Sequence, residues 1–459
     1  YKMSVIEIIN IIKDHLWGYL VLELMLFVGI YQTIKLRGLQ FRYLFKAFKL
    51  LGKQGSSNTS KVNEFGEKIK GDINSFQSLM TALAGSIGTG NITGIATAVM
   101  TGGFGSLFWM WVMAAFGMAT AYSETLLGVK YRETNAMGSM SGGPMYSLKN
   151  GLNSKWLATT YAFLAGVAII GIGCLVQSNS MVDAMASACD IHRTLYGVII
   201  AVAVGAVIIG GVKSIGRVAG YLVPIMAVLY IGAAITVLVC NFDQIPGAIK
   251  LIISSAFTGQ AAVGGFLGST IAITMQNGVQ FGAFANESGL GSLAIAGANA
   301  QVKSPAQQGM MSICGVFLST MIICTLTGLV LAVADVQGST TVNGQVLVGS
   351  PLAMAAFAKT FSWFKYLVML VLNLFAFTTM LAWGYYGEKC FEFLFGEKIV
   401  MPYRWVFTFL VAVGAVLELD MVWAIAGVAT AAMAIPNLIS IFRLSDIVKL
   451  ETDKYLEDF

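Results

Sequence analysis

The sequence predicts an all-α membrane protein with several spanning helices, and its composition and the length of its apolar segments lead to that prediction. Of its 459 residues, 57% are hydrophobic and 11% are charged, and the mean hydropathy is +0.76. Soluble domains carry roughly twice that share of charged residues, because they must cover a surface in water. The apolar runs are too long for the strands of a β-barrel, and they do not alternate. The composition therefore argues against a cytosolic enzyme, a nucleic-acid-binding protein and a disordered chain.

A spanning helix needs about 20 apolar residues, and eleven segments of the sequence approach that length. They cover residues 16–35, 76–100, 105–128, 156–186, 195–211, 217–240, 260–285, 308–333, 362–388, 403–418 and 420–441. Residues 4–15 carry charges among apolar residues, so we expect an amphipathic lead-in there and not a cleavable signal. Residues 35–55 are basic and amphipathic, which predicts a helix on the inner membrane surface, in contact with lipid.

The distribution of positive charge predicts the orientation. With the N-terminus outside and the sides alternating, 22 of the 28 Lys and Arg residues fall on the inner side. Membrane proteins keep such an excess on the cytoplasmic face. We therefore expect a multi-pass protein of the cell membrane with a cytoplasmic C-terminus. The net charge of +5 then reports loop topology and no nucleic-acid partner. The sequence carries no signal for an oligomeric state.

The helix count predicts one extra helix and two blocks of five. Residues 1–75 would hold the extra helix and the basic segment. Residues 76–240 and 258–441 would form the two blocks, and 442–459 a cytoplasmic tail. An odd number of helices per block gives the blocks opposite orientations in the membrane. Such an inverted repeat is typical of secondary transporters.

The first helix of each block contains a glycine-rich interruption. The first runs from Gly85 to Asn91, and the second covers Met275 to Gly278, followed by Gly282. Glycine makes a helix easy to unwind. Unwound backbone is tolerated at membrane depth where it lines a cavity, and there its N–H groups suit a carboxylate and its carbonyls suit Na⁺. The alternative is that these small residues only allow close helix packing.

Titratable side chains are scarce at membrane depth, which favours Na⁺ over a proton as the coupling ion. Glu23, Glu124 and Asp183 lie near helix margins, and we interpret them as packing or interface groups. The six cysteines lack metal-ligand spacing, so no cofactor is expected.

Polar residues inside the predicted helices mark a path. Gln177 and Asn179 lie in the fourth, and Thr378 and Thr379 follow Phe375 by one turn in the ninth. The Phe375 carbonyl and the two hydroxyls could give three oxygens to one ion. Alternatively, the hydroxyls bond only within their own helix.

Six motifs occur in order between residues 76 and 390. They are Thr81-Ala82-Leu83-Ala84-Gly85 running into Gly88-Thr89-Gly90-Asn91, Gly102 to Val112 (GGFGSLFWMWV), Gly142 to Tyr146 (GGPMY), Gly171-Ile172-Gly173 with Val176 to Asn179 (VQSN), Asn286 to Ser292 (NESGLGS), and Trp383 to Glu388 (WGYYGE). Together they resemble the alanine/glycine:cation symporter family. The resemblance implies a five-plus-five inverted repeat of the leucine-transporter type and Na⁺-driven uptake of small neutral amino acids, chiefly alanine and glycine.

The resemblance also implies site residues. The Ala84 and Ile87 carbonyls, with Phe375, Thr378 and Thr379, would bind Na⁺. The substrate carboxylate would meet Gly88, Thr89 and Gly90. Gln177 and the broken segment 274–278 would enclose the amino group and side chain. The full expected substrate site is Gly85, Ser86, Gly88, Thr89, Gly90, Asn91, Gln177, Thr274, Gln276, Asn277, Gly278 and Trp383.

The sequence departs from the family pattern at Phe281, where a basic residue is usual, and this change concerns the inner gate. The amides of Gln276, Asn277 and Gln280 make glutamine an alternative substrate. An H⁺-coupled carrier and an ion channel are less favoured alternatives. The chain contains neither a phosphate-binding Gly-x-x-x-x-Gly-Lys motif nor a recognisable catalytic pattern, so an enzyme or an ATP-driven pump is not expected.

Overall fold

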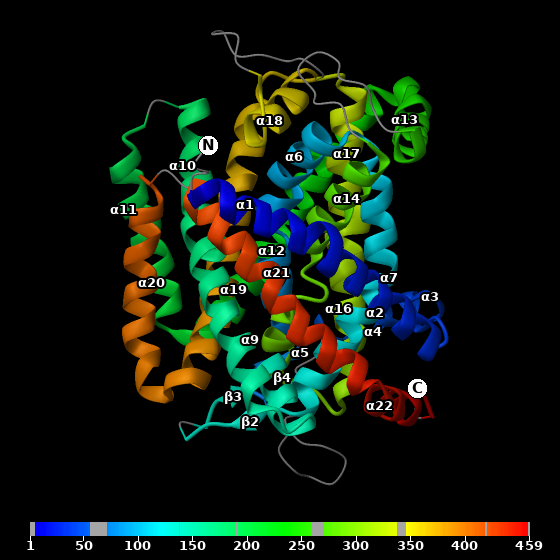
Figure 1. Cartoon of the computed structure of the whole chain (residues 1–459). Coiled ribbons are helices and arrows are strands. Elements are labelled where there is room, and N and C mark those ends of the chain that lie inside the picture. Colours follow the sequence, from blue (N-terminus) through cyan, green and yellow to red (C-terminus); the bar gives the residue numbers. More distant parts are fainter. Residues whose placement is uncertain are drawn as a thin grey trace.

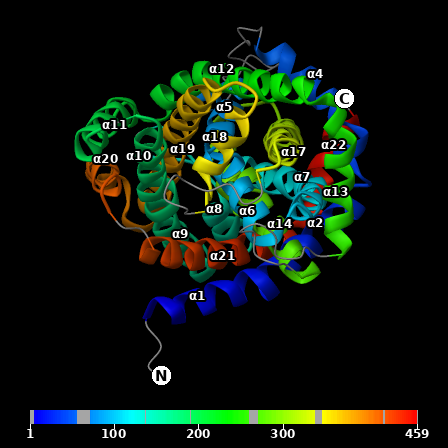
Figure 2. The same cartoon turned by 90° about the horizontal axis from the view of Figure 1, so that it is seen from above.

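The computed structural model describes residues 5–55, 71–136, 138–189, 191–258, 270–336, 346–417 and 420–457. These residues form a bundle of helices with two short two-stranded sheets at one end (Figure 1). A single large cluster of buried apolar side chains runs through the bundle. Viewed along the bundle, α5 and α6 lie in its interior, and α12 and α21 lie on opposite sides (Figure 2).

The first helix begins earlier than the sequence suggests. Helix α1 (Val5–His15) passes through a π-helical turn (Leu16–Val21) into α2 (Leu22–Lys35), and together they form one helix of 31 residues. The amphipathic lead-in expected over 4–15 is helical from Val5 onward, and it continues into the first predicted spanning segment without a break. The reason is packing, because α1 lies along α21 and the Trp17 indole donates to the Gly427 carbonyl at 3.2 Å. Helices α3 (Leu39–Arg42) and α4 (Leu44–Gly55) occupy the basic segment.

The next five predicted segments all contain helices. They are α5 (Ser75–Ser86) with α6 (Thr93–Gly102), α7 (Ser106–Lys130), α9 (Lys155–Ala168) continuing through a π-helical stretch (Ile169–Val176) into α10 (Gln177–Ala188), α11 (Arg193–Ile208) and α12 (Gly211–Cys240). A short 3₁₀ turn (Thr89–Asn91) joins α5 to α6, and α8 (Pro144–Tyr146) precedes a further π-helical turn (Ser147–Gly151).

The last five predicted segments are also helical where they are described. They hold α14 (Ile271–Asn286) with α15 (Ser292–Gly297), α16 (Pro305–Val316) continuing through a π-helical stretch (Phe317–Cys324) into α17 (Thr325–Val333), α19 (Phe364–Phe395), α20 (Val400–Gly414) and α21 (Asp420–Arg443). Residues 260–269 of the seventh segment lie outside the described residues. Helices α13 (Ile245–Thr258), α18 (Ser350–Ala358) and α22 (Ser445–Glu457) were not predicted, nor were the 3₁₀ turns Phe242–Gln244 and Glu397–Ile399.

Seven helical runs in the described ranges are individually long and apolar enough to cross a membrane. The count of eleven spans, the inverted repeat and the division into two blocks stay predictions.

Two interruptions divide helices in the interior of the bundle. The first separates α5 from α6 over residues 87–92, within the predicted glycine-rich segment. The second lies between α14 and α15, where Glu287, Gly289 and Gly291 have φ of +58°, +88° and +85°. The expected break at 275–278 is therefore wrong, since α14 is continuous there.

Close packing explains the small residue at position 278. A Cβ added to Gly278 would lie 2.4 Å from the Ser106 carbonyl oxygen of α7. The glycine lets two helix backbones approach each other, which is the alternative reading of such segments.

Backbone pairing ties the strand-bearing end of the bundle together. Strand β1 (Ile73–Asn74), before α5, pairs in parallel with β4 (Ala300–Gln301), after α15. The Arg132 guanidinium donates to the Ala298 and Ala300 carbonyls at 2.8 Å each. Strands β2 (Glu133–Thr134) and β3 (Met140–Ser141) form an antiparallel hairpin beside it. Both interrupted helices therefore have one end fixed at the same place.

Gly278→Ala should lower the melting temperature of the purified protein. Its methyl group must displace the Ser106 carbonyl, and overpacking of this kind costs roughly 1–3 kcal/mol. The matched control is Gly232→Ala in α12, where a Cβ meets nothing within 4 Å. Equal melting temperatures for the two variants in a detergent thermal-shift assay would contradict a packing role for Gly278.

Candidate substrate and ion site

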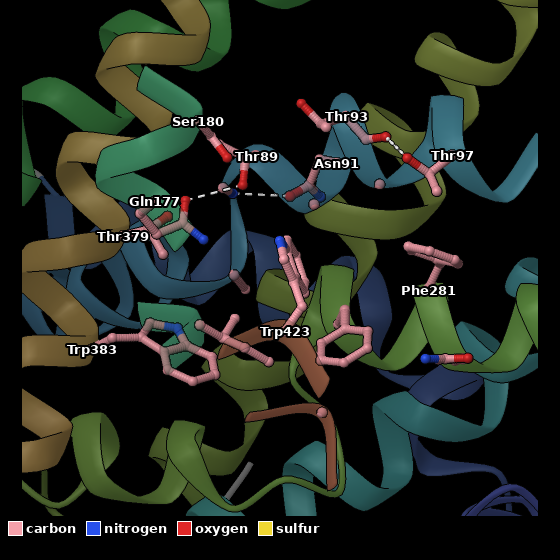
Figure 3. Close-up of a pocket in the computed structure, with 18 of the residues that line it drawn as sticks. Thr89, Asn91, Thr93, Thr97, Gln177, Ser180, Phe281, Thr379, Trp383 and Trp423 are labelled. Carbon is pink, nitrogen blue, oxygen red and sulfur yellow. Dashed lines mark hydrogen bonds between the residues drawn. The ribbon is translucent and has the colours of Figure 1, made fainter. Parts of the chain in front are cut away.

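A cavity of about 640 Å³ lies against the first interruption. The residues around the interruption that line it are Gly85, Ser86, Gly88, Thr89, Gly90 and Asn91, all of them predicted. Side chains from α6, α10, α14, α19 and α21 surround the same space (Figure 3). The predicted first break therefore forms one wall of a cavity large enough for a small molecule.

Asn91 holds the interruption in place. Its Oδ1 accepts from the Gly88 N–H at 2.9 Å, and its Nδ2 donates to the Ser319 hydroxyl at 2.9 Å. The Ser319 hydroxyl in turn donates to the Ala285 carbonyl of α14. Asn91 is buried, so these bonds satisfy its amide and a backbone group that the unwound segment leaves without a helical partner. Asn91 thus both lines the cavity and bonds the unwound segment to the helices around it.

Gln177 reaches the cavity from the end of a π-helical stretch. That stretch, Ile169–Val176, ends directly before Gln177, and such turns are frequent at functional sites. The Thr89 hydroxyl donates to Gln177 Oε1 at 3.0 Å, and Ser180 lines the cavity one turn later (Figure 3). The structure thus brings Gln177 to the first interruption, as predicted, while the predicted path residue Asn179 instead bonds to the Gly414 and Leu417 carbonyls.

Three of the residues predicted to bind an ion meet between α5 and α19. The Thr379 hydroxyl lies 3.1 Å from the Ala84 carbonyl and 2.8 Å from the Phe375 carbonyl. A Cβ on Gly88 would lie 2.6 Å from the same hydroxyl, so that glycine permits the approach. Ile87 directly precedes Gly88 at the end of α5. Three oxygens from two helices therefore cluster near the end of α5, where the interruption begins. Neutral oxygens are suitable ligands for Na⁺.

Thr378 is oriented differently from its neighbour. Its hydroxyl lies 3.1 Å from the Phe375 carbonyl and 3.6 Å from Met226 Sδ, a poor ligand for a hard cation. Both threonines also bond within α19, which is the alternative that the sequence left open. Only Thr379 additionally bonds across to the interrupted helix.

Trp383 connects the cavity to the second interruption. Its indole N–H donates to Glu287 Oε1 at 2.7 Å, and the Ser292 hydroxyl donates to Glu287 Oε2 at 2.5 Å. A Cβ on Gly173 would lie 2.6 Å from the Trp383 Cβ, so the glycine admits the side chain. Sequence reasoning included Glu287 only within a family motif and missed this role.

Glu124 supports the second interruption from α7. Its Oε2 accepts from the N–H groups of Gly289 and Gly291 at 3.2 Å each and from the Asn437 amide at 2.8 Å. Glu124 is 1% exposed, which makes it a core residue and not a margin residue. The interpretation as a packing group holds, but its reason is the capping of unwound backbone.

The predicted residues of α14 lie outside the cavity. The Thr274 hydroxyl donates to the Gly102 carbonyl at 2.8 Å, and Asn277 Oδ1 accepts from the Thr101 hydroxyl at 2.8 Å. Gln276 packs against Gly18, and Gly278 against α7. The structure therefore does not bring these residues to the cavity, because α14 is not broken there and these positions join it to its neighbours. Further along α14, Gln280, Phe281 and Phe284 do line the cavity.

Several cavity residues were not predicted. They include Ile6, Asn10 and Lys13 of α1, Thr93 and Thr97 of α6, and Trp423 and Gly427 of α21. The two threonines are four residues apart on one helix face, a spacing that could have identified them. Nothing local marks the residues of α1 and α21, because only tertiary packing brings these helices to the cavity. Phe281, which the sequence analysis related to the inner gate, lies in the cavity wall.

Comparison with known proteins gives the family. The model of the sodium:alanine symporter family matches residues 2–459. The chain belongs to that family. It is 42% identical to the sodium/alanine symporter AgcS of Methanococcus maripaludis, over 99% of this chain and 98% of that protein. It is 35% identical to the probable sodium/glutamine symporter GlnT of Bacillus subtilis, over 96% and 89%.

The fold is also found among solved transporters. The structure of MhsT in complex with L-phenylalanine superposes with a TM-score of 0.59 at 14% identity, covering 84% of this chain and 93% of that one. At this identity the likeness concerns the fold alone, and it is that of the leucine-transporter type. The chain is therefore a multi-pass membrane carrier, by family a sodium-coupled amino-acid symporter, and not an enzyme.

Thr379→Val should raise the Na⁺ concentration for half-maximal uptake roughly 5- to 100-fold. The change keeps the shape of the side chain and removes the hydroxyl that meets the Ala84 carbonyl, a loss of about 1–3 kcal/mol. Thr378→Val is the matched comparison and should have the smaller effect. The measurement is Na⁺-dependent uptake in proteoliposomes, and identical Na⁺ dependence of wild type and Thr379→Val would exclude this ion site.

Gly90→Leu should abolish substrate binding and leave folding intact. The nearest atom to a Cβ at this position is the Phe284 carbonyl oxygen, at 3.8 Å, so the added side chain has room and extends into the cavity. The test is ligand-induced thermal stabilisation of the purified variant. Normal stabilisation by substrate would show that the cavity beside Gly90 is not the binding site.

Proposed function

We propose that the protein imports alanine and glycine together with Na⁺ across the cell membrane. The observation that carries the proposal is the joining of an unwound helix, a cavity with many uncharged polar lining residues, and a cluster of backbone and hydroxyl oxygens in one place. The N–H side of an unwound helix suits the carboxylate of an amino acid, and the oxygen cluster suits Na⁺. The similarity to AgcS supports alanine as the substrate.

In this proposal the amino acid binds beside Gly88, Thr89 and Gly90. Gln177 accepts a hydrogen bond from Thr89 and so lies next to the bound amino acid. Trp383 closes the side of the cavity toward the second interruption. Na⁺ binds at the Ala84, Ile87 and Phe375 carbonyls and the Thr379 hydroxyl, and no other cofactor is required. Binding of each solute must raise the affinity for the other, because coupling is reciprocal.

We propose that the strand-bearing end of the bundle faces the cytoplasm, with the N-terminus outside. Lys130, Arg132 and Lys149 lie around the β2–β3 hairpin at that end, in agreement with the positive-inside rule (Figure 1). The pairing of β1 with β4 and the clamp of Arg132 close the site toward the same end. The structure then corresponds to a state closed on the inside, and import requires these contacts to open.

Glutamine is the second candidate. Four amide side chains, from Asn10, Asn91, Gln177 and Gln280, line the cavity, and its volume of about 640 Å³ exceeds the need of alanine. GlnT supports this reading. Gln276 and Asn277 no longer do, because they lie outside the cavity.

Alanine uptake into proteoliposomes should require an inward Na⁺ gradient and should be competed by glycine more strongly than by glutamine. One elementary charge moving through 100 mV supplies about 2.3 kcal/mol, enough for tens-fold accumulation. Stronger competition by glutamine would transfer the assignment to the second candidate. Uptake of neither solute by a folded, sealed preparation would overturn both.

A further inference from the structure

The extra N-terminal helix forms part of the cavity wall. Ile6, Asn10 and Lys13 of α1 all line the cavity, although the helix lies outside α21 in the bundle (Figure 2). These residues are three or four positions apart, so they share one face of the helix. The helix is therefore a component of the binding region and not only a peripheral anchor.

Lys13 is the one formally charged side chain among the cavity-lining residues of the described ranges. The other lining residues from the first interruption and from α6, α10, α14, α19 and α21 are all neutral. In such surroundings a single ammonium group determines the sign of the local potential, and a carboxylate is the part of an amino acid that it attracts.

The neighbours of the Lys13 ammonium leave it available. It donates to Asn10 Oδ1 at 3.1 Å, and Asp14 Oδ1 lies 3.7 Å away. The Asp14 side chain is 65% exposed, against 27% for Lys13. A solvent-exposed ion pair at this distance is worth little, so the carboxylate of a ligand can compete with it. The Asn10 amide next to the ammonium supplies a second polar group for the same ligand.

The position of Lys13 is built into the packing of three helices. Its stem crosses α21 at Gly427, where a Cβ would lie 2.8 Å from Lys13 Cδ. One turn later, Trp17 bonds to the Gly427 carbonyl and packs against Phe284 of α14, with ring centroids 5.1 Å apart. Gly427 and Phe284 also line the cavity. A side chain larger than glycine at 427 would push the lysine stem away from it.

We propose that Lys13 and Asn10 form an outer subsite that binds the α-carboxylate of the amino acid before it reaches the first interruption. This proposal rests on the proposed amino-acid transport. The cavity has more room than alanine fills, so one molecule can occupy an outer and then an inner position. The outer position increases the local concentration of substrate and disfavours cationic amino acids. Lys13 is thus a positioning and specificity residue that acts on affinity and not on the turnover of the loaded carrier.

The test compares Lys13→Met, which keeps the stem and removes the charge, with Lys13→Arg, which keeps the charge. The assay is Na⁺-dependent alanine uptake in proteoliposomes with equal amounts of reconstituted protein. Lys13→Met should raise the KM for alanine roughly three- to tenfold with an unchanged maximal rate, as expected for one charged hydrogen bond near solvent. Lys13→Arg should remain near the wild-type KM. Lys250→Met removes an exposed charge from α13, away from the cavity, and controls for overall charge.

A second measurement separates electrostatics from packing. At constant Na⁺, added choline chloride should raise the wild-type KM, because salt screens the attraction, and the Lys13→Met variant should lack this dependence. The subsite would be overturned if Lys13→Met had the same KM for alanine as the wild type. It would also be overturned if Lys13→Met and Lys13→Arg raised that KM equally. Absence of Na⁺-dependent alanine uptake by the wild type would instead reject the proposed function, so the two failures are distinguishable.

Discussion

The bond between the Gly88 N–H and the Asn91 side chain is the interaction on which the rest of the site depends. A helix can be interrupted inside a membrane only if its freed backbone groups find partners, since each unsatisfied group costs several kcal/mol. Asn91 provides one such partner. Its amide donates to the Ser319 hydroxyl, which in turn donates to the Ala285 carbonyl, and both residues belong to other helices. The interruption is thus stabilised by a local bond that contacts with other helices hold in place. Its position beside Thr379 and Gln177, and so the cavity itself, follows from that anchoring.

The second interruption is held by a different kind of group. Glu124 caps the amides of Gly289 and Gly291, and Asn437 bonds to Glu124 and to the Gly289 carbonyl, so α7 and α21 together fix the start of α15. Glu287 adds a link from this interruption to Trp383 in the cavity. Carboxylates accept strong hydrogen bonds from backbone N–H groups, which makes them effective caps for unwound segments. Trp383 therefore lies between the cavity at the first interruption and Glu287 at the second.

The sequence was sufficient for the helical architecture and the first interruption, because composition and three closely spaced glycines are local properties. It failed at the second interruption for a physical reason. Gly278 is used for contact with the Ser106 carbonyl, whereas the break uses positive φ at Glu287, Gly289 and Gly291. A glycine in the sequence does not reveal which of these demands it meets. The contributions of Lys13 and Trp423 were equally hidden, since helices distant in sequence bring them to the cavity.

The proposed transport requires the strand-bearing end of the bundle to open. Helices α5 and α15 flank the two interruptions. Helix α5 begins, and α15 ends, beside the β1–β4 pair, where Arg132 donates to the Ala298 and Ala300 carbonyls. Opening this end requires the guanidinium to release two backbone acceptors and the short strand pair to separate. These contacts lie at the margin of the bundle, where Ala300 belongs to a small apolar cluster separate from the large buried core, and opening at such a margin costs less than repacking the core. In the proposed cycle the interruptions are the points about which the helix segments next to the strand pair move, because unwound backbone bends where a continuous helix resists. The residues proposed to bind the solutes would thus also permit the motion that releases them.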